Sequence, residues 1–148
     1  MKIYSSKAIH LIKKFEGFSD FPYICPAGKK TIGYGYVLNK TDFLCKVSKK
    51  TADILLLGSL TPIVKCLHQK VKVELSQNQF DALCSLIYNW GVRGFSRSKG
   101  LKQLNNNNYT QAAFEFFDKD IGVVNVKGVP NSGLIRRRKA EYKLWTNK

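Results

Sequence analysis

The sequence predicts an α+β fold in which a small antiparallel β-lobe and a mainly helical lobe are joined by a long helix. Helical periodicity holds over residues 6–16 and returns from residue 48 onward. Residues 18–37 are instead rich in β-formers, glycine and proline. A sheet this small is not stable alone and must pack on helices. We therefore expect one domain over residues 1–148.

The composition is that of a globular and strongly basic protein. The 148 residues include 25 Lys and Arg against 10 Asp and Glu, for a net charge of +15. Such a charge predicts a polyanionic partner, which is a nucleic acid, an acidic membrane or an acidic polymer such as a bacterial wall. The charge divides evenly, with +8 on residues 1–74 and +7 on residues 75–148. This even division disfavours a discrete nucleic-acid-binding arm.

The N-terminus and the cysteines indicate the cellular compartment in which the protein accumulates. Residues 1–6 lack the charged, apolar and small-residue order of a secretory signal. The longest apolar run, residues 54–57, is far shorter than the roughly 20 residues that span a bilayer. We expect no transmembrane segment and accumulation in the cytoplasm, where thiols stay reduced. The cysteines are widely spaced and form no CxxC pair, which predicts no metal site: Cys25, Cys45, Cys66 and Cys84.

The first helix and the β-lobe occupy the N-terminal third. Ser6 can cap a helix over about 6–16, and Gly17 can end it. The β-lobe is expected at about 17–47, with a turn where proline and glycine interrupt the β-formers.

A connecting helix is expected at about 48–72. Its apolar residues can form one long stripe, made of Ile54, Leu55, Leu57, Ile63, Val64 and Leu67. Pro62 either kinks this helix or splits it, because proline lacks a backbone donor.

The helical lobe is expected at about 73–148. Ser76 and Gln79 form a capping box that opens a helix ending near Gly91. Further helices are expected at about 98–105, after residue 110, and at about 132–145. A loop containing Gly128 precedes the last of these.

Glu16 is the first candidate for chemistry, since it ends the first helix between Phe15 and Phe18. Apolar surroundings disfavour the ionised form of a carboxyl group, which suits a general acid. Tyr23 follows after seven residues, and the segment Thr31-Ile32-Gly33-Tyr34-Gly35 begins after fifteen.

This pattern resembles the phage-type lysozymes, the endolysins of glycoside hydrolase family 24. Their signature is a glutamate at the end of helix one, an aspartate nine residues later and a threonine six beyond it, within Thr-Ile-Gly-Tyr-Gly. Glu16, position 25 and Thr31 keep both intervals. Similar segments follow at 77–83, at 88–91 and at 133–138 with Glu141, so the resemblance covers nearly the whole chain.

The resemblance implies a lysozyme-like fold with an active-site cleft between the lobes. It also implies hydrolysis of the β-1,4 bond between N-acetylmuramic acid and N-acetylglucosamine in peptidoglycan. Glu16 would protonate the leaving oxygen, while Thr31 and a second group would hold water on the opposite face, an inverting arrangement. Arg136 or Arg137 would ion-pair with Glu16.

Further expectations follow from the same resemblance. Tyr34 and Tyr36 would bind substrate, although Tyr36 stands where many family members have histidine. No cofactor and no metal are implied. The enzyme would act as a monomer, without nucleic acid, and would depend on a holin to reach the periplasmic wall.

Position 25 departs from the commonest pattern because it holds Cys25 rather than aspartate. A free thiol titrates near about 8.5, so only a few per cent is thiolate at pH 7. Cys25 would act as a weak base that orients water, as a thiolate nucleophile that changes the stereochemistry, or as a spectator while Glu16 makes both proton transfers. Asp20 is an alternative carboxylate, although its spacing does not fit the family role.

Other functions compete with the muramidase interpretation. A lytic transglycosylase would cleave the same bond with one acid and leave a 1,6-anhydro sugar. A catalytically inactive basic module would bind wall or nucleic acid without turnover. Residues 136–145 combine basic residues with Leu144 and Trp145, which would serve either anionic lipid or helix packing.

Overall fold

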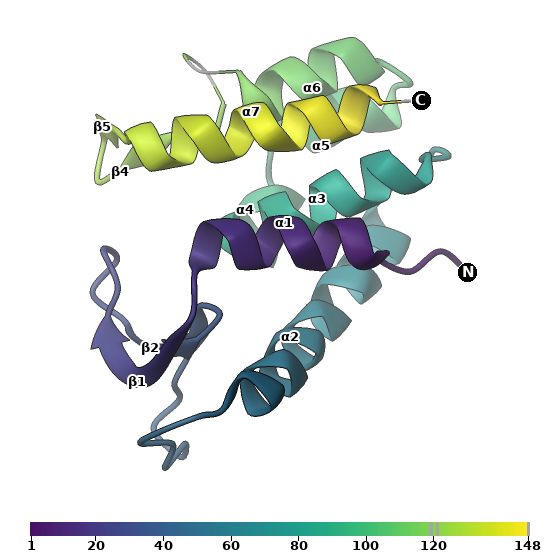
Figure 1. The fold of residues 1–148 in the computed structure, drawn as a ribbon. Coiled ribbons are helices and arrows are strands. Elements are labelled where there is room, and N and C mark those ends of the chain that lie inside the picture. The colour runs from purple at the N-terminus through teal and green to yellow at the C-terminus, as the bar shows by residue number, and fades with distance from the viewer. Residues whose placement is uncertain (119, 121, 148) are drawn as a thin grey trace.

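The computed structural model describes residues 1–118, 120 and 122–147. The elements follow one another as α1 (Ser6–Glu16), β1 (Ser19–Ile24), β2 (Lys30–Gly33), β3 (Tyr36–Val37), α2 (Lys49–Lys70), α3 (Gln77–Trp90), α4 (Val92–Ser96), α5 (Lys99–Asn105), α6 (Tyr109–Phe117), β4 (Asn125–Val126), β5 (Val129–Pro130) and α7 (Ser132–Thr146). The β-lobe lies at one end of α2, and the other helices gather around α3 and α7 (Figure 1). The α+β prediction is therefore confirmed.

The β-lobe is an antiparallel sheet in the order β1-β2-β3. Tyr23, Thr31 and Val37 are neighbours across its strands, so their side chains share one face. A small core of Ile32 and two partners, Val47 and Ala52, joins the sheet to the start of α2. This contact holds the turn between β2 and β3 beside the end of α1.

Helix α2 runs unbroken from Lys49 to Lys70, although Pro62 lies inside it. The alternative in which Pro62 splits this helix is therefore wrong, because one missing donor is outweighed by the packing of its buried face. Ile54 and Leu57 are 63% and 40% exposed, so the single apolar stripe expected from the sequence is also wrong.

By length and composition alone, α2 would suffice to cross a bilayer. One window of 18 residues has a mean hydropathy of 1.2, and 33% of it is buried. The expectation of no such segment rested on uninterrupted apolar runs, whereas α2 reaches this average with polar residues interspersed. Leu56, Leu60 and Leu67 are part of the main core, as in the core helix of a folded domain.

The helical lobe is built around α3, which packs against α1, α2 and α7. Its predicted capping box is confirmed, because Ser76 accepts from the Gln79 amide and Gln79 accepts from the Ser76 amide. The core includes buried side chains of Leu83, Leu86, Phe95 and Phe116.

The segment before α7 differs from the loop that the sequence predicts. Strands β4 and β5 form a hairpin with Val126 opposite Val129. Lys127 and Gly128, between them, both have positive φ, at 50° and 80°, as a two-residue type I′ turn requires. A Lys-Gly pair is a weak signal for this turn, so periodicity alone did not reveal the hairpin.

Helix α7 buries much of what the sequence offered as a lipid-binding segment. Arg137 and Arg138 are 3% and 0% exposed, and Trp145 is 5% exposed. These three side chains therefore pack within the helical lobe. The interpretation that residues 136–145 bind lipid is wrong for Arg137, Arg138 and Trp145.

Candidate active site

Glu16 is the last residue of α1, which ends because Gly17 turns the chain at a φ of 66°. The Arg137 Nη1 donates to Glu16 Oε1 over 2.6 Å, and the Glu16 side chain is 19% exposed. Of the two arginines considered from the sequence, Arg137 makes this contact. The surroundings of Glu16 are therefore less apolar than its flanking phenylalanines suggest.

Arg137 is held by a buried polar network. Its Nε donates to Glu141 Oε1 over 3.1 Å, and its Nη2 donates to the Ser85 carbonyl over 3.1 Å. Ser85 Oγ donates to Glu141 Oε1 over 2.6 Å, and Arg138 donates to the other carboxylate oxygen of Glu141. Burial lowers the pKa of the Arg138 guanidinium, which the charge of Glu141 opposes. Each polar group thus has partners, and Arg137 is fixed in direction toward Glu16.

Glu141→Ala is expected to destabilise the fold by roughly 3–5 kcal/mol, because it leaves Arg137 and Arg138 buried without their shared carboxylate. Urea denaturation followed by circular dichroism measures this loss. Glu74→Ala, at an exposed glutamate, is the matched control and should change stability little. A loss equal to that of the control would contradict the structural role of the network.

The turn between β2 and β3 approaches Glu16 closely at Gly35. A Cβ built on Gly35 would lie 2.6 Å from Glu16 Oε2, and the φ of Gly35 is 80°. On the other side of the turn, Tyr88 Oη donates to the Tyr34 carbonyl over 2.7 Å. Burial first, and then the charge of Glu16, raises the pKa of Tyr88, which keeps this phenol a hydrogen-bond donor. Glycine is thus required where the turn meets the carboxylate.

Gly35→Ala should lower the lytic rate at least about tenfold, because the added methyl displaces the Glu16 carboxylate. Gly128→Ala is the control: its φ is also positive, at 80°, but nothing lies within 4 Å of its Cβ. It carries the backbone strain without the clash. Equal rates for the two variants would show that the approach to Glu16 is unimportant.

Cys25 and Thr31 lie together beside the turn that follows β1. The Cys25 amide donates to the Lys29 carbonyl over 2.9 Å, and the Thr31 hydroxyl donates to the same carbonyl over 2.9 Å. Burial raises the pKa of the Cys25 thiol, but hydrogen bonds from Lys29, Thr31 and Ala27 and the charge of Lys29 lower it by more. The net pKa lies below the ordinary value, which favours a thiolate.

Tyr23 is a further candidate for the site, which the sequence marks only by its interval of seven residues from Glu16. It is the cross-strand neighbour of Thr31. Burial raises the pKa of the Tyr23 phenol, and the charges of Glu16 and Cys25 raise it further. Tyr23 therefore lies within electrostatic reach of both residues, which a spacing pattern alone cannot reveal.

Tyr34 and Tyr36, the two tyrosines predicted to bind substrate, have contacts of their own. The Tyr34 ring lies 5.5 Å from the Phe18 ring, with Lys13 Nζ 4.9 Å from its centroid. Tyr36 Oη donates to Asp42 over 3.2 Å. These contacts stabilise the β-lobe, and the two rings flank the turn at Gly35.

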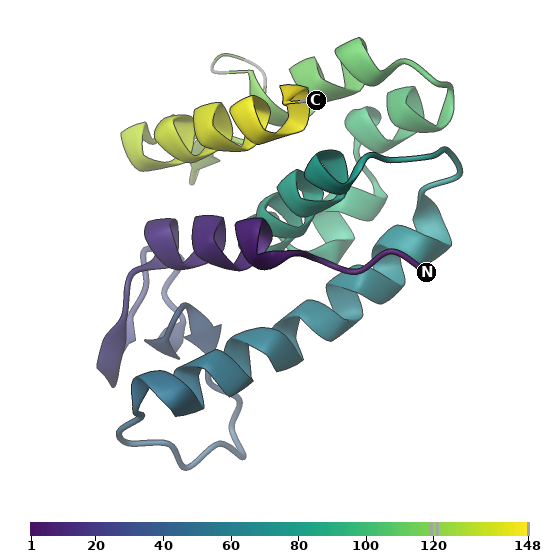
Figure 2. The same ribbon diagram turned by 45° about the vertical axis from the view of Figure 1, so that its right-hand side comes forward.

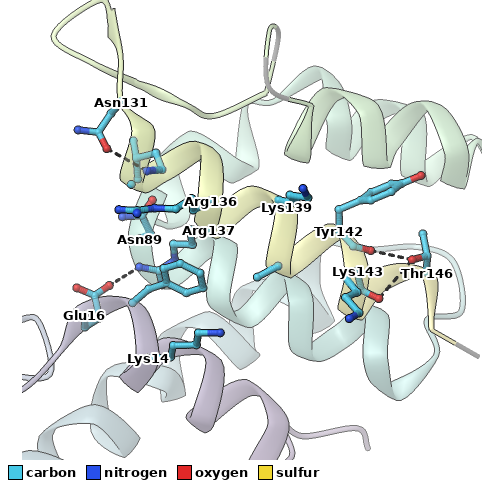
Figure 3. Close-up of a pocket in the computed structure, with 14 residues that line it drawn as sticks. Lys14, Glu16, Asn89, Asn131, Arg136, Arg137, Lys139, Tyr142, Lys143 and Thr146 are labelled. Carbon is cyan, nitrogen blue, oxygen red and sulfur yellow. Dashed lines mark hydrogen bonds and ion pairs between the residues drawn. The ribbon is translucent and has the colours of Figure 1, made fainter.

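A basic groove of about 960 Å³ opens beside Glu16, between α1 and α7. Figure 3 shows Glu16 and Arg137 pointing toward one another at one end of it. Its charged lining consists of Lys14, Glu16, Arg136, Arg137, Lys139 and Lys143. Cys25, Thr31, Tyr34 and Tyr36 are not part of the lining of this groove. In the described part of the chain, no cluster of three His, Cys, Asp or Glu residues could hold a metal.

Comparison with known proteins shows which family the chain resembles. A family model described as phage lysozyme matches residues 13–141. The chain is 39% identical over 143 residues to an endolysin of Acyrthosiphon pisum secondary endosymbiont phage 1, which covers 95% of this chain and 96% of that protein. It is 34% identical over 145 residues to an endolysin of Bacillus phage B103, covering 95% of this chain and 53%, about half, of that longer protein.

A solved structure gives the same result. The muramidase domain of SpmX from Asticaccaulis excentricus is 32% identical, with a TM-score of 0.85 over 100% of both chains. The lysozyme-like fold is therefore confirmed. The chain belongs to the phage lysozyme family, and it is a glycoside hydrolase that acts on bacterial peptidoglycan.

Proposed function

We propose that the chain cleaves the β-1,4 bond between N-acetylmuramic acid and N-acetylglucosamine, with Glu16 as the general acid. The observation that carries this proposal is the fixed carboxylate of Glu16, held by Arg137 and pressed against Gly35. A general acid must stay in one place relative to the leaving oxygen, and these two contacts determine that place.

The proposed reaction is a single displacement by water. The proton of Glu16 moves to the leaving oxygen as the bond from that oxygen to the anomeric carbon breaks. Water, held by Cys25 and Thr31, forms the new bond to the anomeric carbon from the opposite face. The proton that water loses moves to the Cys25 thiolate. The product has the inverted configuration at the anomeric carbon.

The environment of Cys25 supports this role as a base rather than that of a spectator. Backbone hydrogen bonds from Lys29 and Ala27 and the charge of Lys29 lower the pKa of this thiol, which stabilises a negative charge on sulfur. The neighbouring Tyr34 and Tyr36 rings, on either side of Gly35, are proposed to border the sugar.

Alkylation tests the thiolate directly. The rate of Cys25 modification by iodoacetamide should rise with pH around a midpoint below about 8.5, the ordinary thiol value. Lys29→Met should move this midpoint upward, because it removes a positive charge that stabilises the thiolate. Mass spectrometry of the peptide that contains Cys25 separates it from the other thiols. A midpoint at or above the ordinary value would contradict the base role.

The hydrolase proposal as a whole is tested on isolated sacculi. Purified protein should release soluble muropeptides continuously, and the release should increase with time at constant enzyme. Binding to sacculi without release would instead support an inactive wall-binding module.

Access to the wall and oligomeric state are further proposals. We infer that the protein works as a monomer and needs a holin to reach the periplasm. Expression with and without a coexpressed holin should give lysis only in the first case. Light scattering of the purified protein should give the mass of one chain.

A further inference from the structure

Helix α2 carries apolar side chains on two opposite faces. Its inner face is buried in the core, as at Leu56 and Leu60, which are 1% and 0% exposed. Its outer face exposes Ile54 and Leu57, at 63% and 40%. Only 33% of its most apolar window is buried. The helix is therefore more apolar than its place in the core requires.

The exposed side chains form one stripe, which we call the α2 outer face. Its spacings of four, three, one, three and four residues place it on a single side of the helix. The stripe consists of Lys50, Ile54, Leu57, Gly58, Thr61 and Lys65, all exposed. A Cβ on Gly58 would have nothing within 4 Å, so the middle of the face is open.

Charge on this face has one sign. Lys50 and Lys65 stand at its two ends, about 22 Å apart along the helix at the usual rise of 1.5 Å per residue. The stripe holds no acidic residue, and the acidic residue beside it, Asp53, is paired with Lys13 over 2.5 Å. The face therefore combines an apolar centre with a cation at each end.

We propose that the α2 outer face docks on a membrane surface that contains anionic phospholipid. Ile54 and Leu57 enter the boundary between headgroups and acyl chains, while Lys50 and Lys65 reach the lipid phosphates. The net charge of +15 draws the whole molecule to such a surface. Because the inner face of α2 is part of the core, the helix lies along the membrane and does not cross it.

The loop next to α2 shows the same combination of exposed apolar and basic side chains. Figure 2 shows the loop over 38–48 and α2 along the same side of the molecule. Phe43 in this loop is 94% exposed, and Lys40 and Lys46 flank it. An exposed aromatic side chain among lysines suits the same interface.

A second copy of the chain fits this face less well. Pairing two α2 outer faces in antiparallel order would bring Lys50 toward Lys65 of the second copy at both ends. Neither lysine finds a carboxylate on the opposing stripe, and the net charge of +15 on each molecule opposes association.

Vesicle sedimentation tests the proposal on the full chain. Wild type should bind vesicles of phosphatidylcholine and phosphatidylglycerol in equal parts, but not vesicles of phosphatidylcholine alone. Ile54→Ser with Leu57→Ser should lower this binding about tenfold or more, because it removes the apolar contact. Lys50→Glu with Lys65→Glu should lower it as well. Val129→Ser is the matched control, since Val129 is 65% exposed outside this face.

The serine pair separates the α2 outer face from general charge, because it leaves the net charge of +15 unchanged. Ile54→Ser with Leu57→Ser and the control Val129→Ser should keep wild-type release from lipid-free sacculi and the same circular dichroism spectrum, because they leave the net charge unchanged and lie outside the site. Unchanged binding by the serine pair, or binding to phosphatidylcholine alone, would overturn the proposal. The proposal would also be contradicted if light scattering showed a dimer that Ile54→Ser with Leu57→Ser separates into monomers, while the wild type bound no vesicles.

Discussion

Glu16→Gln should lower the rate of peptidoglycan cleavage by about 10²–10⁴-fold, the usual contribution of a positioned general acid. Glutamine keeps the size of the side chain and can still accept a hydrogen bond from Arg137. It has no proton to give to the leaving oxygen. The variant should therefore bind sacculi as wild type does and release muropeptides far more slowly.

The control for this result is Glu74→Gln, at an exposed glutamate outside the site. It changes the net charge by the same amount, so it corrects for altered attraction to the anionic wall. The activity of both variants is measured as the muropeptides released per unit time, and circular dichroism checks their folding. Equal rates for Glu16→Gln and wild type would remove Glu16 from the chemistry.

Substitutions at Cys25 should distinguish among its three possible roles, which are base, nucleophile and spectator. Cys25→Asp supplies a carboxylate at the family position and should keep activity near that of wild type. Cys25→Ala and Cys25→Ser remove the base and should lose about 10²–10⁴-fold. The steady-state rate on sacculi is the measurement, and the anomer of the product is read by NMR.

Each result selects one role for Cys25. Equal rates in all four proteins would make Cys25 a spectator. A retained anomer in wild type and an inverted one in Cys25→Asp would make the thiolate a nucleophile, because displacement through sulfur inverts twice. Inversion in both agrees with a base.

The sequence motifs predicted those features of the site that depend on residues close together in the chain. The interval from Glu16 to Thr31 fits within one helix end and one hairpin, so spacing alone carries it. The ion pair of Glu16 joins residues 121 positions apart. Arg136, Arg137 and Arg138 are consecutive and point in three directions about 100° apart. Only the packing of α7 decides which of them faces Glu16.

Helix α2 shows the same limit for the core. Its run from residue 54 to residue 57 is apolar on every side, so periodicity cannot choose the inner face. The structure buries Leu56 and exposes Ile54 and Leu57. The close approach of Gly35 to Glu16 was equally hidden, because a motif gives the order of residues and not the distance between them.

Water, and not a hydroxyl group of the substrate, should attack the anomeric carbon when Glu16 protonates the leaving oxygen. Digestion of sacculi in water enriched in oxygen-18, followed by mass spectrometry, tests it most directly. If water is the nucleophile, each new reducing end carries one heavy oxygen from the solvent. Unlabelled 1,6-anhydro products, lighter than the ordinary muropeptides by one water, would contradict it and identify a lytic transglycosylase.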